Sequence, residues 1–105
     1  MSEQMNMNGS NLQVCSTNPM TGWTRNGYCE LGEGDSGAHH VCATMTRDFL
    51  DFTKSRGNDL SSVVNENDKW CICQLRYKEA HDAGFAPPVD MQATHMITND
   101  NIKNI

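Results

Sequence analysis

The clearest hydrophobic pattern in the chain predicts a helix from about residue 46 to residue 56. Phe49 and Phe52 recur at helical spacing on one side of this segment, and charged residues occupy the others. Thr46 provides a side-chain oxygen for the first free backbone N–H groups, and Gly57 suits the left-handed turn that follows many helices. These signals predict both ends of the helix.

A second helix is predicted from about residue 73 to residue 83. Tyr77 and Ala80 share one face of it, and Gly84 is placed to end it. The proline pair Pro87-Pro88 prevents the helix from continuing, because proline lacks the backbone N–H.

Two further stretches have the pattern of strands. Residues 69–72 are rich in strand-forming side chains, and Val89, Met91 and Ala93 alternate with polar residues. In this second strand His95 would point to the same side as Val89. Two main helices with a few short strands predict a small α+β domain with a loop-rich N-terminal half.

The N-terminal part of the chain has no regular period. Residues 1–13 are rich in Asn and Met and are expected to form a mobile tail, with a single domain over 14–105. Residues 15–40 contain many Gly, Asn, Thr and Ser residues and several turn signals, such as Asn18-Pro19 and Asn26-Gly27. About a quarter of the chain is therefore expected to be loop.

Charge and hydropathy exclude two classes of partner. The net charge is −5, and the eight Lys and Arg residues form no basic stripe, which argues against nucleic acid as a partner. No apolar run approaches the roughly 18 residues of a membrane span, so no membrane partner is expected. The start of the chain lacks the features of a signal peptide, and a soluble, cytoplasmic protein is therefore expected.

The five cysteines suggest thiol or metal chemistry. An odd count without an export signal favours reduced thiols over a disulfide framework. A zinc site would need about four thiolate or imidazole ligands, and Cys42, Cys71, Cys73 and His95 are the candidates. The chain has no pair of Cys-x-x-Cys motifs, so the alternative is that these thiols are small buried core groups.

The chain as a whole resembles a known bacterial family. The segments that carry the resemblance are CSTNPMTGWTRNGYC, GDSGAHHVCATMTRDFLDFTKSRGNDLS, DKWCICQLRYKEAHDAGFAPPV and ATH. In this order they resemble domain of unknown function 2237, from Cys15 to His95. The resemblance implies a compact α+β fold and supplies no activity, substrate or catalytic residue.

Two departures from the family pattern are visible. The stretch VVNEN is shorter than the corresponding Pro- and Gly-containing stretch of most members. Tyr28 stands where many members have a second cysteine. A function that depended on that loop or on a vicinal thiol pair would not carry over.

A small enzyme that pairs a cysteine with a histidine is one alternative for the function. Cys42 and Cys73 are the candidate nucleophiles, and His39, His40 and His95 are the candidate bases. The competing interpretation is that His40 and His95 are hydrogen-bonded packing residues.

The leading hypothesis is a non-enzymatic module that binds a small molecule or a protein partner. Loops held on a rigid scaffold are common binding sites, and the loop half of this chain is dense in polar residues. The predicted ligand-binding residues are Trp23, Arg25, His39, His40, Arg56, Asn58, Asp59 and His95.

Overall fold

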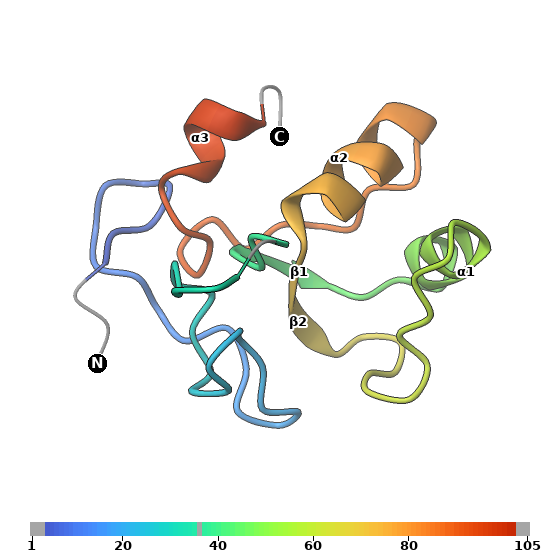
Figure 1. The fold of residues 1–105 in the computed structure, drawn as a ribbon, viewed down its shortest axis with the longest axis horizontal. Helices are drawn as coiled ribbons and strands as arrows, with labels where there is room; N and C mark the ends of the chain where they lie inside the picture. Colours follow the sequence, from blue (N-terminus) through green and yellow to red (C-terminus); the bar gives the residue numbers. More distant parts are fainter. Residues whose placement is uncertain (1–3, 36, 103–105) are drawn as a thin grey trace.

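A two-stranded antiparallel sheet lies at the centre of the protein. The computed structural model describes residues 4–35 and 37–102. Strand β1 (Val41–Thr44) pairs with strand β2 (Lys69–Ile72), and Cys42 lies directly opposite Cys71. In Figure 1 the helices α1 and α2 lie on one side of these strands, and the loops of the N-terminal half lie on the other.

The alternation of side chains along the strands divides the interior into two parts. Successive residues of a strand point to opposite faces of its sheet. One face contributes to the larger hydrophobic core through Val41, Ala43, Trp70 and Ile72. The other face carries Cys42 and Cys71, which belong to a separate buried cluster beside the loops. The sheet thus joins a helical half to a loop half.

Helix α1 (Arg47–Ser55) confirms the first predicted helix. The Phe49 N–H donates a 3.1 Å hydrogen bond to the Thr46 hydroxyl, so Thr46 caps the helix as its sequence position predicts. Gly57 adopts a positive φ of 92°, which places it in the left-handed region. Phe49 is fully buried and packs in the core against the sheet.

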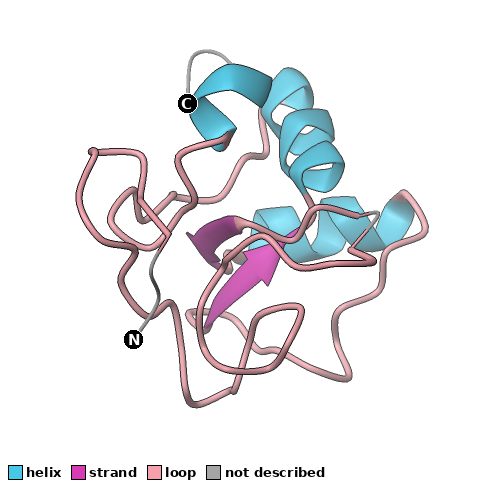
Figure 2. Ribbon diagram, turned by 60° about the vertical axis from the view of Figure 1, so that its left-hand side comes forward, coloured by secondary structure: helices cyan, strands magenta, loops and turns pink. Residues whose placement is uncertain are grey.

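Helix α2 (Gln74–Ala83) confirms the second predicted helix and starts directly after β2. Its Tyr77 and Ala80 are buried in the same core as α1, and Gly84 ends it with a φ of 86°. Figure 2 shows that loops make up most of the rest of the chain. A third, short helix, α3 (Thr98–Asn101), lies near the end of the described residues, and residues 103–105 lie outside them.

The predicted strand over residues 89–95 is wrong. This segment forms isolated bridges and a turn, because the Asp90 side chain accepts the Gln92 N–H at 3.1 Å and its carbonyl accepts the Ala93 N–H at 3.1 Å. Met91 is therefore exposed, although the alternating pattern assigns it to a buried face. The strand that pairs with residues 69–72 is β1, which is not among the strands predicted above.

Residues 4–13, which the sequence assigns to a mobile tail, pack against the body of the domain. Leu12 and Asn6 are each 2 % exposed. The amide of Asn6 donates to the carbonyls of Asn11 and Gln92, and its oxygen accepts two backbone N–H groups of its own turn. A buried asparagine with all of its hydrogen bonds satisfied anchors this segment. Residues 1–3 lie outside the described part of the chain.

Candidate functional site

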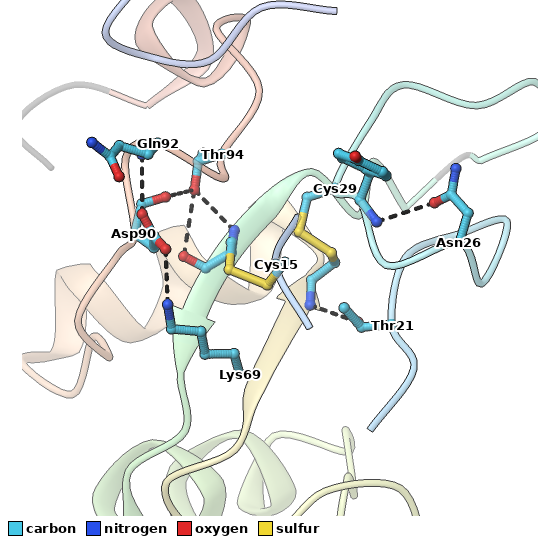
Figure 3. Close-up of a disulfide and its surroundings, with 11 residues drawn as sticks. Cys15, Thr21, Asn26, Cys29, Lys69, Asp90, Gln92 and Thr94 are labelled. Atoms are coloured by element: carbon cyan, nitrogen blue, oxygen red, sulfur yellow. Dashed lines mark hydrogen bonds and ion pairs between the residues drawn. A yellow bond between two sulfur atoms is a disulfide. The ribbon is translucent and has the colours of Figure 1, made fainter. Parts of the chain in front are cut away.

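Two disulfides attach the loop half to the central sheet. Cys15 bonds to Cys42 on β1, and Cys29 bonds to Cys71 on β2, with Cα–Cα distances of 5.8 and 5.3 Å. Because Cys42 and Cys71 are opposite neighbours in the sheet, the two bonds leave the same face side by side (Figure 3).

The expectation of reduced thiols is therefore wrong for four of the five cysteines. The odd count arises because one cysteine, Cys73, stays free and half-buried while the others pair. The paired cysteines are 27 and 42 residues apart in the sequence. Local spacing therefore could not reveal which of them pair.

The four paired sulfurs form one buried cluster. The sulfur atoms of Cys15, Cys29 and Cys42 all lie within 4.8 Å of one another, and Cys71 is bonded to Cys29. The predicted metal set overlaps this cluster in Cys42 and Cys71, whereas Cys73 and His95 lie outside it. The cluster is compatible with metal binding.

A cavity of about 290 Å³ opens beside the disulfide cluster. Strand β2 and the start of α2 form one part of its lining, and the loops around residues 22–39 and 58–63 form the rest. The lining residues are Gly22, Trp23, Arg25, His39, Asn58, Asp59, Leu60, Ser62, Val63, Trp70, Cys71, Ile72 and Cys73.

One wall of the cavity is a stacked pair of rings. The rings of Trp23 and His39 are 5.7 Å apart and nearly parallel, at 8°. Asp35 holds His39 in place, because its carboxylate contacts the His39 ring Nδ1 at 2.6 Å and accepts the His39 backbone N–H at 2.8 Å. Trp23 is fixed by a 3.1 Å hydrogen bond from its indole N–H to the Glu33 carbonyl.

Gly32 and Gly37 lie so close to these rings that neither position has room for a side chain. A Cβ atom on Gly32 would come within 2.7 Å of the Trp23 ring, and one on Gly37 within 2.6 Å of the His39 ring. Both distances are shorter than any ordinary contact, so only glycine lets the two rings lie against the backbone. These two glycines therefore make room for the rings of the wall.

The lining of the cavity also contains two charged side chains, those of Arg25 and Asp59. The Arg25 guanidinium lies over the Trp70 ring, 5.2 Å from its centroid, and donates a 2.6 Å hydrogen bond to the Gly22 carbonyl. Asp59 accepts the Ser61 N–H at 2.9 Å, and hydrogen bonding by Ser61 lowers the pKa of Asp59. One cation and one ionised carboxylate thus line the same small space.

The structure brings together five of the eight predicted ligand-binding residues in this lining, namely Trp23, Arg25, His39, Asn58 and Asp59. The other three do not line it: Arg56 pairs with Glu79 at 3.3 Å, and His40 and His95 are buried elsewhere. Trp70, which is not among the predicted residues, is both part of the core and a cavity wall.

His40 and His95 form a buried pair with a structural role. Their ring centroids are 6.4 Å apart. The His40 nitrogens contact the Thr98 hydroxyl at 2.8 Å and the side-chain Oε1 of Gln74 at 3.1 Å, and the His95 Nδ1 accepts the Ile97 N–H at 3.0 Å. Burial lowers the pKa of both rings and so favours their neutral forms.

The predicted catalytic candidates are therefore spread over three surroundings. Cys42 is in a disulfide, Cys73 lines the cavity at the start of α2, and both histidines are engaged in hydrogen bonds within the interior. The histidine that lines the cavity together with Cys73 is His39, which the sequence offers both as a ligand-binding residue and as a candidate base.

The family of the chain follows from a match along almost its whole length. The model of the family DUF2237, described as an uncharacterized protein conserved in bacteria, matches residues 5–104. The chain belongs to the DUF2237 family. A comparison with curated proteins finds no match. The DUF2237 match includes all five cysteines and the whole lining of the cavity. Among residues 4–35 and 37–102, no helix is long and apolar enough to cross a membrane.

Removing either disulfide should lower the free energy of unfolding by about 3–4 kcal/mol, because each closes a long loop in the unfolded chain. We expect this loss for the Cys15→Ala/Cys42→Ala variant in urea unfolding monitored by circular dichroism. The Cys73→Ala variant, which breaks no disulfide, is the control. Equal stability of the two variants would contradict the structural role of the bond.

Stability should fall as the pH drops below about 6.5, the ordinary pKa of histidine. In this pH range the unfolded chain takes up protons more readily than the folded protein, in which burial disfavours protonation of His40 and His95. Protonation therefore stabilises the unfolded state relative to the folded state. Urea unfolding at pH 7.5 and 5.5 measures this difference. It should shrink in His40→Gln and persist in His81→Gln, a variant of a more exposed histidine. An unchanged pH dependence in His40→Gln would contradict the attribution of this pH dependence to His40.

Proposed function

We propose that this DUF2237 protein is a non-enzymatic module that binds a small, planar organic acid in the cavity beside β2. The observation that carries this proposal is the convergence of Trp23, Arg25, His39 and Asp59 on one preformed space. These residues come from two separate loops, and only the fold makes them neighbours. The metabolite class follows from the chemistry of the lining.

The shape of the cavity favours a ring-containing ligand. Its volume of about 290 Å³ is at the lower end of the range for small-molecule sites. Trp23 is 44 % exposed, and its ring is nevertheless held by a stack on His39 and by the hydrogen bond to Glu33. An exposed, fixed aromatic face is a surface on which a planar ligand stacks without loss of side-chain freedom.

The charge in the cavity favours an acidic group on that ligand. The Arg25 hydrogen bond to Gly22 uses one of the five N–H donors of a guanidinium. Its position over the Trp70 ring, 5.2 Å from the centroid, keeps the guanidinium at the cavity, where its planar fork of donors suits a carboxylate. Asp59 faces the same space and suits a ligand that carries a hydrogen-bond donor away from its acid group.

Arg25→Gln should weaken binding of such an acid about 10- to 100-fold, the effect of losing a charge-assisted hydrogen bond. The matched control is Arg56→Gln, which removes an exposed arginine outside the cavity. Aromatic and heteroaromatic carboxylic acids would be screened by thermal shift, and the binders measured by calorimetry. Equal affinities for the two variants would contradict the role of Arg25.

The free thiol gives a second measure of occupancy. Cys73 lines the cavity and is the unpaired cysteine, so a bound acid should slow its alkylation by iodoacetamide. If no acid raises the melting temperature or protects Cys73, the small-molecule proposal fails. The hypothesis of a protein partner would then take its place.

A further inference from the structure

The buried sulfur cluster has the composition of a metal site. Four sulfur atoms, from Cys15, Cys29, Cys42 and Cys71, are gathered where none of the residues is more than 5 % exposed. They come from four separate positions along the chain, two in loops and two on opposite positions of the sheet. This arrangement has no Cys-x-x-Cys motif, which is why a search for such motifs does not find it.

The distances among three of the four sulfurs are close to those in a zinc tetrathiolate. Zn²⁺ binds four thiolates tetrahedrally at about 2.3 Å, which places neighbouring sulfurs about 3.8 Å apart. The sulfurs of Cys15, Cys29 and Cys42 already lie within 4.8 Å of one another, although two of them belong to one disulfide and the third to the other. Shifts on the order of 1 Å after reduction would bring these three sulfurs to the required distances. The fourth sulfur, that of Cys71, is bonded to Cys29 in the oxidised protein and would complete the set once that bond is reduced.

The backbone around the cluster is held by hydrogen bonds that do not depend on the disulfides. The Cys42 N–H donates to the Thr94 hydroxyl at 2.9 Å, and the Cys71 N–H donates to the Thr21 hydroxyl at 2.9 Å (Figure 3). The Cys15 N–H donates to the Gly27 carbonyl at 2.7 Å. Breaking the sulfur bonds therefore leaves these strands and loops with local contacts that keep the thiols near one another.

We propose that, when both disulfides are reduced, the thiolates of Cys15, Cys29, Cys42 and Cys71 bind one zinc ion. A dithiol reductant supplies two electrons and two protons to each disulfide and becomes a disulfide itself. The four thiols then lose four protons on binding Zn²⁺, which gives a tetrathiolate complex. Oxidation by a disulfide-forming oxidant reverses the sequence and releases the metal.

With such a site, the four cysteines would attach the same loops to the sheet in two alternative ways. In the oxidised protein, covalent bonds attach the loops to the sheet, and in the reduced protein the metal does so. The inference is independent of the cavity ligand, because none of its four thiols needs the organic acid. It also differs from the set predicted by sequence, which contains Cys73 and His95 in place of Cys15 and Cys29.

The test uses the whole protein reduced with dithiothreitol, desalted under argon and supplied with Zn²⁺. We expect about one equivalent of bound zinc, and cobalt substitution should give the absorption of a tetrahedral thiolate complex. Cys73→Ser should keep the metal, whereas Cys29→Ser should reduce the affinity at least tenfold. Less than a tenth of an equivalent of zinc in the wild type would overturn the proposal.

A second measurement covers the case in which Cys29→Ser does not fold. In the reduced wild-type protein with zinc, alkylation followed by mass spectrometry should find Cys73 modified and the other four cysteines protected. Zinc should also raise the melting temperature of the reduced protein. Protection of Cys73 instead, or equal reactivity of all five thiols, would show that zinc does not bind in this cluster.

Discussion

The structure depends on the attachment of its loop half to a very small sheet. Two strands of four residues each have little surface of their own, and the helices cover one face of them. On the other face, Cys42 and Cys71 lie side by side and bond to two loop segments, which are otherwise held by hydrogen bonds and isolated bridges. Such crosslinks lower the conformational entropy of the unfolded chain and so favour one shape of a long loop region.

The cavity is a consequence of that attachment. The Cys29–Cys71 bond brings the segment that carries Trp23 and Arg25 to β2, where Trp70 meets the guanidinium. Glycines let the rings of the wall lie against the backbone. Gly22 has a positive φ, and a Cβ atom at this position would collide with the Tyr28 carbonyl. The polar loops form a fixed lining because the sulfur cluster lies directly behind them.

Local signals in the sequence predicted both main helices, including the Thr46 cap and the left-handed Gly57 and Gly84. The alternating residues near Met91 were misread as a strand, because the Asp90 side chain and carbonyl form a turn there. Five of the predicted ligand-binding residues line one cavity, although they come from two loops that are far apart in the sequence. Arg56 does not line it and pairs with Glu79 on α2.

The sequence by itself determined the α+β class, the helix ends, the family resemblance and the acidic, loop-rich character of the chain. These properties depend on neighbouring residues, which local patterns record. The tertiary structure alone decided which cysteines pair, that Asn6 anchors the first segment, and that His40 and His95 are interior packing groups. Each of these depends on contacts between residues far apart in the chain, and such distances follow only from how the sheet, helices and loops pack together.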